Sequence, residues 1–489
     1  MGKYRFVRVI GATALSIVPV LVFMSCGSSM PNLSDSLQGP TPDSSVVQLP
    51  EAATTATPTP DVGVGPGSEP AMEAASPAGD ASDASNGAQD ADSCEAGLSG
   101  CGSRCVDLQA DPNNCGSCGH LCGGTGSTCN AGTCACAGSF TLCPQQNQCF
   151  DLTSDPSNCG FCGYGCQGGA CASSLCQPTT IVSGSCFGGD IAIDMTNIYW
   201  TNGMSAGAVY FKPFASAANA QSISTSENIP SGIALGSNAV YWVDFNSGAV
   251  GTSEIVNGNF QIPLYFEPAS GSAGPIAVAV DTHNIYWVNR VAGTVNQLPL
   301  SAMLGPADAD GGTPPMVLAS GRDQPTALVV DSANVYWVDF GSTQSPTGTV
   351  NMVPIGGNNA QVVPLATGQS QPIDIATSGT DAYVYWVNQA QRPNGSVQRV
   401  PKAGGAMPTL LATTLGGPTG IAVDSQYVYW TNFNDGTVQK VALAGPSEGG
   451  APYTLATGQD TPQAITVDSV SVYWASHGTG NILKVAKGY

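Results

Sequence analysis

Residues 417–443 read GPTGIAVDSQYVYWTNFNDGTVQKVAL, and this stretch decides the fold of the C-terminal part of the chain. Residues 274–300, GPIAVAVDTHNIYWVNRVAGTVNQLPL, repeat the same order of features. Each stretch holds three short runs of apolar and β-branched residues separated by turn residues, which is typical of three antiparallel strands. Both carry a Tyr-Trp pair in the second run, so this pair marks an internal repeat.

All seven tryptophans of the chain follow a tyrosine, and successive tryptophans lie between 42 and 50 residues apart. A period in this range, with several short strands per repeat, is typical of a β-propeller. Neighbouring side chains of a strand point to opposite faces, so we expect each pair to press one ring against each neighbouring sheet. The pairs are Tyr199-Trp200, Tyr241-Trp242, Tyr286-Trp287, Tyr336-Trp337, Tyr385-Trp386, Tyr429-Trp430 and Tyr473-Trp474.

Each repeat divides into four predicted strands. The first follows a proline in six repeats and Gly188 in the other, and an Asp closes it in five repeats and opens the next turn. The seventh repeat stops after its third strand, while 180–184 match the fourth-strand pattern of 454–458. We therefore predict an all-β, seven-bladed propeller over 178–489, in which the N-terminal strand closes the last blade and removes the exposed sheet edge.

The repeats resemble the YWTD propeller of low-density-lipoprotein-receptor type proteins and the wider NHL-like group. The motif is YWTN at 199–202 and 429–432 and becomes YWVD, YWVN or YWAS elsewhere. The better-known members of that family have six blades, so seven repeats depart from its pattern. The resemblance implies a propeller scaffold for 178–489, on which the repeated aromatic pair is a packing element.

Sixteen cysteines crowd into two consecutive modules, 94–135 and 136–177. The segments CVDLQADPNNCGSCGHLC and CFDLTSDPSNCGFCGYGC share one spacing of four cysteines. Eight cysteines per module predict four disulfides each, with the connectivity left open among 105 pairings, because so small a module needs cross-links. The sixteen are Cys94, Cys101, Cys105, Cys115, Cys118, Cys122, Cys129, Cys134, Cys136, Cys143, Cys149, Cys159, Cys162, Cys166, Cys171 and Cys176.

The modules resemble the cysteine-rich repeat of plant stigma-specific proteins, which also occurs in bacterial surface proteins and implies no activity. A metal or redox site built on the C-x2-C pairs is the alternative, but His120 is the only histidine nearby. Cys186 is left over, and we expect it to be buried and inert or linked to another chain. So many cysteines predict an oxidising compartment.

The N-terminal segment carries the basic residues Lys3, Arg5 and Arg8, followed by an apolar run that is too short and broken for a comfortable membrane span. Its end, Phe23-Met24-Ser25-Cys26, resembles a bacterial lipobox. The resemblance implies a signal peptide over 1–25, lipidation of Cys26, and a membrane anchor in the cell envelope, leaning towards the outer membrane. An ordinary signal peptide of a secreted protein is the alternative.

Residues 26–93 hold the lipidation site and a segment rich in Ala, Ser, Pro and Asp, with ten acidic residues and no Lys or Arg. Such a composition predicts a disordered linker. The whole chain has a formal net charge of −21. A chain this acidic repels phosphate backbones, so nucleic acid is excluded as a partner.

Candidate binding residues are those that differ between repeats on one face of the propeller. The position two residues after the repeat-opening proline holds carboxylates in only two repeats, and the position three residues after Trp holds mostly aromatic, basic or amide side chains, which we expect to be exposed. Two longer loops, 339–348 and 388–395, add to this rim. The candidates are Asp190, Phe245, Arg290, Phe340, Asp374, Gln389, Arg392, Phe433 and His477. Solvated loop residues without a ligand are the alternative.

The sequence favours binding or adhesion, towards a protein or a glycan, over catalysis. It contains no nucleophile motif, no phosphate loop and no histidine cluster, so we predict no catalytic residue, cofactor or metal ligand. The alternative is a metal-dependent lyase or hydrolase on the propeller, with His477 and Asp190 at its metal. A propeller scaffold by itself does not identify the ligand.

Overall fold

The computed structural model describes residues 94–184, 188–215, 219–256, 259–261, 264–266, 273–303, 314–379, 381–390, 393–445 and 451–488. The predicted signal peptide, Cys26, the linker up to residue 93, Cys186 and Arg392 lie outside these ranges. The described regular structure is β apart from α1 (Leu300–Met303) and the 3-10 helix η1 (Asn359–Gln361). No helix in these ranges is long and apolar enough to cross a membrane.

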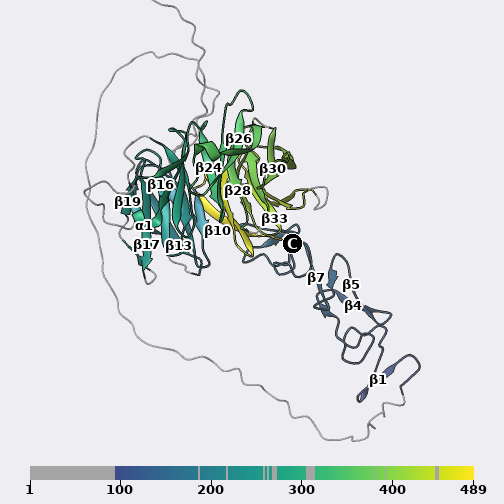
Figure 1. The fold of residues 1–489 in the computed structure, drawn as a ribbon. Coiled ribbons are helices and arrows are strands. Elements are labelled where there is room, and N and C mark those ends of the chain that lie inside the picture. The colour runs from purple at the N-terminus through teal and green to yellow at the C-terminus, as the bar shows by residue number, and fades with distance from the viewer. Residues whose placement is uncertain are drawn as a thin grey trace, which may run out of the picture.

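Seven antiparallel sheets follow one another along the described residues from 179 onwards (Figure 1). Sheets 1 to 6 are β11–β14, β15–β19, β20–β23, β24–β27, β28–β31 and β32–β35, and sheet 7 is β36–β38 with β10. The first strands are β11 (Ile191–Ile193), β15 (Pro230–Leu235), β20 (Pro275–Val280), β24 (Pro325–Val330), β28 (Pro372–Ala376), β32 (Pro418–Val423) and β36 (Pro462–Val467). The second strands are β12 (Asn197–Asn202), β16 (Ala239–Asp244), β21 (Asn284–Asn289), β25 (Asn334–Asp339), β29 (Tyr383–Asn388), β33 (Tyr427–Asn432) and β37 (Ser471–Ser476).

The third and fourth strands complete each sheet. The third strands are β13 (Gly207–Pro213), β17 (Val250–Val256), β22 (Thr294–Pro299), β26 (Gly348–Pro354), β30 (Gly395–Pro401), β34 (Thr437–Ala442) and β38 (Asn481–Ala486). The fourth strands are β14 (Gln221–Glu227), β19 (Leu264–Phe266), β23 (Met316–Ala319), β27 (Val363–Gln369), β31 (Thr409–Leu415), β35 (Tyr453–Ala456) and β10 (Thr179–Val182). A short β18 (Asn259–Phe260) extends the end of β17. Strand β10 pairs antiparallel with β38, so the two ends of the repeat region meet in sheet 7.

The Tyr-Trp pairs form the interfaces between sheets. The tyrosine of one sheet and the tryptophan of the next share a buried cluster, as in Tyr199 with Trp242, and Tyr473 of sheet 7 shares one with Trp200 of sheet 1. The remaining interfaces follow the same rule. All seven tryptophans are fully buried. Truncating a ring of this kind costs about 3–5 kcal/mol, so these clusters are the core of the repeat region.

The repeated aspartate that follows the first strand has two tasks. In sheet 3, Asp281 Oδ1 accepts hydrogen bonds from the backbone N–H groups of His283 and Asn284, and its Oδ2 accepts one of 2.7 Å from Tyr286 Oη. The first task, holding the turn, follows from the sequence. The second, fixing the tyrosine of the aromatic pair, does not. Four other sheets have the same pair, namely Asp194–Tyr199, Asp331–Tyr336, Asp424–Tyr429 and Asp468–Tyr473, and in sheet 5 Tyr385 donates to Asp381, which lies one residue closer to its tyrosine.

The cysteine modules contain eight disulfides among the described residues, four in each, so the prediction of a disulfide-rich region is confirmed. Both modules join their cysteines in the same order, first to third, second to fifth, fourth to seventh and sixth to eighth. The pairs are Cys94–Cys105, Cys101–Cys118, Cys115–Cys129, Cys122–Cys134, Cys136–Cys149, Cys143–Cys162, Cys159–Cys171 and Cys166–Cys176. Such bonding is consistent with an extracellular or secreted protein.

The modules contain nine short strands among the described residues. They are β1 (Ser99–Cys101), β2 (Arg104–Val106), β3 (Gly123–Gly124), β4 (Ser127–Asn130), β5 (Thr133–Cys136), β6 (Thr141–Cys143), β7 (Gln148–Phe150), β8 (Cys171–Ala172) and β9 (Leu175–Cys176). Strand β3 of the first module pairs with β7 of the second. In Figure 1 the modules form a narrow arm that leaves the sheets beside the C-terminus, with β1 at its far end.

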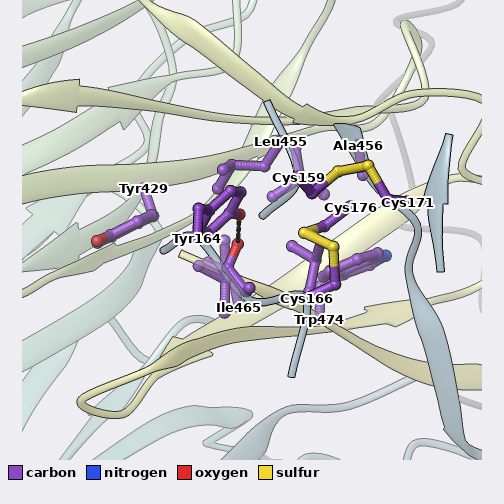
Figure 2. Close-up of a cluster of buried hydrophobic side chains, with 14 residues drawn as sticks. Cys159, Tyr164, Cys166, Cys171, Cys176, Tyr429, Leu455, Ala456, Ile465 and Trp474 are labelled. Atoms are coloured by element: carbon purple, nitrogen blue, oxygen red, sulfur yellow. Dashed lines mark hydrogen bonds between the residues drawn. A yellow bond between two sulfur atoms is a disulfide. The ribbon is translucent and has the colours of Figure 1, made fainter. Parts of the chain in front are cut away.

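The second module packs on sheets 6 and 7, which the sequence does not predict. Figure 2 shows the ring of Tyr164 near Leu455 and Ile465, beside the Cys159–Cys171 and Cys166–Cys176 disulfides. Tyr164 Oη donates a buried hydrogen bond of 3.0 Å to the carbonyl of Ala486. Burial raises the pKa of Tyr164 to about 12. The module is therefore fixed to the propeller core through apolar contacts and a tyrosine that stays a hydrogen-bond donor.

Candidate functional site

The loops at the ends of the second strands define what we call the rim face. Six residues that follow Trp by three positions occupy equivalent places there, because each donates its backbone N–H to the carbonyl of the residue before the proline position that opens its own repeat. The bonds run from Phe245 to Ile229, Arg290 to Gly274, Phe340 to Gln324, Gln389 to Gln371, Phe433 to Gly417 and His477 to Thr461. The structure thus brings these sequence candidates onto one face, in register.

The expectation that the rim aromatics are exposed is wrong for Phe340, which is only 5% exposed. The guanidinium of Arg290 lies over its ring, 5.5 Å from the centroid, and donates a hydrogen bond of 3.3 Å to Gln324 Oε1. Burial also lowers the pKa of Arg290. These two candidates pack against each other, while Phe245, Gln389, Phe433 and His477 are half-buried.

The two longer loops line an open cavity of about 180 Å³ on the rim face. The loop 339–348 contributes Ser342 and Gln344, the loop 388–395 contributes Asn394, and Ser370 lies between them. Gln344, Ser370 and Asn394 are exposed. The cavity therefore offers hydroxyl and amide groups to a ligand, and the predicted candidate Arg392 lies on the second loop, outside the described residues.

Asp190 and Asp374 occupy equivalent positions at the first strands of sheets 1 and 5. Asp374 Oδ1 accepts from the backbone N–H of Ile375, and its Oδ2 accepts from that of Ile421 in the next sheet, at 2.8 and 2.9 Å. Asp190 likewise accepts from Ile191. Burial raises the pKa of Asp190 to about 6 and that of Asp374 to about 7, the latter with a contribution from the charge of Asp190.

The charge of Asp190 therefore contributes to the raised pKa of Asp374, and the hydrogen bond from Ile421 to Asp374 joins two neighbouring sheets. Both keep some exposed surface. Their hydrogen bonds give them a packing task, so the expectation of a ligand site at this pair stays a prediction.

His477 is the histidine that the alternative metal-dependent lyase or hydrolase would use at its metal. Burial lowers the pKa of its imidazole, against a smaller opposing effect from the charge of Asp460. Among the described residues, the groups of three possible metal ligands are Cys115, Cys122 and Cys134 and their counterparts in the second module, Cys159, Cys166 and Cys176. All six belong to disulfides, so they offer no thiolate to a metal.

A different set of contacts, which the sequence reasoning missed, joins consecutive sheets on the rim face. We call it the inter-sheet position: the residue three before the repeat-opening proline, with its partner two after the following Trp. Between sheets 4 and 5, Gln369 Oε1 accepts from Trp386 Nε1 and from Asn388 Nδ2, both at 3.1 Å. Between sheets 6 and 7, Gln459 accepts from Trp474 Nε1 at 3.2 Å. A neutral amide is thus one solution at this position.

The same position holds an ion pair at sheet 4. Arg322 Nη2 lies 2.5 Å from Asp339 Oδ2, and Arg322 Nε donates to the same oxygen at 3.0 Å. Thr349 and Asn351 donate to that oxygen as well, and Trp337 Nε1 donates to Oδ1 at 3.0 Å. The buried Asp339 is therefore neutralised and hydrogen-bonded on both oxygens.

At sheet 2 the position holds two acids, Glu227 and Asp244, each 3% exposed. Ser224 Oγ donates to Glu227 Oε1, and Ser247 Oγ reaches Asp244 Oδ2 at 3.5 Å. Asp244 Oδ1 has no hydrogen-bond partner. Burial, followed by the hydrogen bond and the charge of Glu227, raises the pKa of Asp244 to about 8. The two acids line a cavity of about 290 Å³ that opens on the rim face.

Comparison with known proteins supports the fold. Solved structures similar to this chain include virginiamycin B lyase from Staphylococcus aureus, with a TM-score of 0.50 and 11% identity over 63% of this chain and 98% of that one. A streptogramin B lyase matches with a TM-score of 0.50 and 13% identity over 63% and 96% of the two chains. Kuenenia stuttgartiensis hydrazine synthase matches with a TM-score of 0.50 and 12% identity over 63% and 97%.

No protein-family model and no curated protein sequence matches this chain. The structural neighbours are β-propeller proteins, and the repeat region of this chain has the β-propeller fold. Identities this low show the fold alone.

Proposed function

We propose that this chain is a surface-anchored binding protein whose propeller presents its rim face to a protein or glycan ligand. The observation that carries the proposal is the cavity between the two longer loops of sheets 4 and 5. Its lining groups Gln344, Ser370 and Asn394 are exposed amides and a hydroxyl, which suit hydrogen bonding to sugar hydroxyls or to a peptide backbone. Half-buried Phe245 and Phe433 on the same face add apolar surface.

The scaffold of the proposal is a closed ring of seven blades, one for each sheet. Three contacts support closure. Tyr473 and Trp200 share a cluster between sheets 7 and 1, β10 pairs with β38, and the first strand of sheet 1 contacts those of sheets 2 and 7. A closed ring leaves no free edge between first and last blade, so the rim is a rigid platform.

The position of the second cysteine module supports the direction of presentation. Its Tyr164 bonds to Ala486, which pairs with Ser471 at the start of β37, whereas the rim residue His477 follows the end of that strand. The arm therefore joins the sheets at the end away from the rim. A chain anchored at Cys26 and extended through the linker and the modules would then turn the rim face outwards.

The test is a triple variant on the rim, Gln344→Ala, Ser370→Ala and Asn394→Ala, assayed with the purified full chain on a glycan array and on immobilised envelope and culture-fluid proteins. We expect at least a tenfold loss of binding, because about three ligand hydrogen bonds of roughly 0.5–1.5 kcal/mol each are removed. The control is Met195→Ser with Val470→Ser, which changes two exposed residues in turns at the opposite ends of the strands.

Binding that survives the rim variant and fails in the control would show that the ligand uses the other face. Equal loss of binding in both variants would indicate damage to the fold. The near-ultraviolet circular dichroism of the buried tryptophans measures such damage independently.

A further inference from the structure

We propose that Glu227 and Asp244 form a binding site for a divalent cation, with Ca²⁺ as the ion that fits best. The site lies between sheets 1 and 2 on the rim face and is separate from the loops of the proposed ligand cavity. The proposal rests on how the same place is filled elsewhere in this molecule.

The first step is the equivalence of the two places. Glu227 pairs with Gly207 at the start of its third strand, and Arg322 donates its backbone N–H to the corresponding Gly293. Asp244 and Asp339 each lie two residues after a Tyr-Trp pair. The backbone therefore puts Glu227 where Arg322 stands, facing an aspartate in both cases.

The second step is the charge at each place. Asp339 receives a cation from the chain itself, since Arg322 binds its Oδ2. At sheet 2 the residue in the place of that cation is an acid. The other lining residues of the cavity beside Glu227 and Asp244 are neutral, among them Thr225, Asn228 and Ser247. Two carboxyls removed from water next to each other require a positive charge or a proton.

Asp244 also has a carboxylate oxygen that accepts no hydrogen bond. Both oxygens of Asp339 accept hydrogen bonds, whereas Asp244 Oδ1 is buried without a partner in a side chain that is 3% exposed. This side chain lines a cavity of about 290 Å³, ample for an ion with bound water. An unpartnered carboxylate oxygen at a cavity wall is the feature that a cation would complete.

The donor chemistry selects the ion. Every lining side chain except that of Ala249 offers oxygen, as carboxylate, hydroxyl or amide carbonyl, and none offers sulfur or imidazole. Hard oxygen donors suit Ca²⁺, which accepts an irregular shell of six to eight oxygens, better than Mg²⁺, which needs a near-octahedral one. Two carboxylates and an open cavity place the dissociation constant at about 10⁻⁴–10⁻³ M, as in extracellular calcium modules.

The experiment uses the full chain after treatment with EGTA. Titration with CaCl₂ in a calorimeter measures binding, and tryptophan fluorescence during thermal unfolding measures stabilisation of the propeller, because all seven tryptophans lie there. We expect one site and a melting temperature that rises with CaCl₂. In the variant Glu227→Gln with Asp244→Asn, which reproduces the Gln369–Asn388 pair, affinity should fall by at least about tenfold.

The control variant Asp323→Asn with Asp460→Asn removes the same charge from exposed residues of the rim face and should bind Ca²⁺ as the wild type does. If the double variant does not fold, Glu227→Gln alone serves, since glutamine stands at this position in two other sheets. The proposal is overturned if the wild type binds no Ca²⁺, if the control loses binding as much as the variant does, or if the pair holds a proton only, so that CaCl₂ leaves the melting temperature unchanged.

Discussion

A buried aspartate occupies equivalent positions in sheets 2 and 4 of the propeller, but the side chains that face it carry opposite charges. At sheet 4, Asp339 is neutralised by Arg322 and accepts hydrogen bonds on both oxygens. At sheet 2, Asp244 faces another acid, Glu227, and one of its oxygens has no partner. The strand register is the same in both, and the surrounding side chains differ: Glu227 stands in place of Arg322, and Ala249 and Gly251 stand opposite the pair where sheet 4 has Thr349 and Asn351.

The difference teaches how to separate packing from function in a repeat protein. A buried charge is tolerated when its compensation is built in, as at Asp339, and such a pair adds little net stability over apolar packing. A buried acid pair without a built-in cation costs stability unless something from outside compensates it. Within one chain, the sheets that solve the problem internally identify the sheet that does not.

The largest expected effect comes from removing Arg322, whose charge neutralises the buried Asp339. Arg322→Gln leaves the nearly buried Asp339 without its cation, and removing one partner of a buried ion pair costs about 3–5 kcal/mol. Urea unfolding followed by tryptophan fluorescence measures the loss. Arg104→Gln, at an exposed arginine of the first cysteine module, is the matched control and should change stability by less than about 0.5 kcal/mol.

A loss below about 1 kcal/mol for Arg322→Gln would show that Thr349, Asn351 and Trp337 suffice to hold the Asp339 charge. The contrast with Asp244 would then not rest on the arginine, and the argument for a missing cation at sheet 2 would lose its reference.

The sequence predicts those features of the fold that recur from one repeat to the next. The Tyr-Trp pairs, the turn aspartates and the fourth strand displaced to 179–182 recur or complete a pattern, so periodicity finds them. The cysteine spacing predicts the disulfide modules for the same reason. Packing of Tyr164 on sheets 6 and 7 has no periodic signal, because it joins two unrelated modules through one contact surface.

Several features of the candidate site cannot be found from the repeat pattern alone. The sequence reasoning looked for variation at the positions of Phe245 and Asp190, and the structure places these on one face or between inner strands. It missed the inter-sheet position because Glu227, Arg322, Gln369 and Leu415 share neither size nor charge, and only the register of the strands makes them equivalent. Counting back three residues from each proline would have found the charge reversal, but nothing in the sequence says that this residue faces the one after Tyr-Trp. Burial of Phe340 depends on the ring being covered by Arg290, which is a tertiary contact.

A smaller effect is expected from the acids that backbone amides compensate. The pKa of Asp190 is raised to about 6 and that of Asp374 to about 7, so the folded state binds protons more tightly than the unfolded state, whose value is 3.8. The stability that these two acids contribute should therefore fall as pH rises from about 4 to about 7, while the raised pKa of Asp244 extends the fall of the whole protein to about pH 8. Because a pKa unit is worth about 1.4 kcal/mol and both groups are partly exposed, Asp374→Asn should flatten this fall by about 1–2 kcal/mol.

The measurement is urea unfolding of wild type and variant at a series of pH values. Asp323→Asn, at an exposed acid, should leave the profile unchanged. An Asp190→Asn variant adds a second check, because removing its charge should lower the pKa of Asp374 and move the fall to lower pH. A profile that rises with pH over this window would contradict the assignment of these acids as costly when ionised.

The smallest expected effect is a gain in the free energy of unfolding when a hydrogen-bond acceptor is added at the inter-sheet position. Gln369 accepts from Trp386 Nε1, whereas Leu415 stands at the same register in sheet 5, and Trp430 Nε1 of sheet 6 is buried without a partner. Leu415→Gln should supply the missing acceptor and raise the free energy of unfolding by about 0.5–1.5 kcal/mol. The reverse change, Gln369→Leu, removes an acceptor from Trp386 and Asn388 and should lower it by about 1–3 kcal/mol. If both variants lose stability equally, apolar packing around Leu415 outweighs the hydrogen bond there. The variety at this position would then reflect the local space in each sheet, and the acid pair at sheet 2 would stand out by its charge alone.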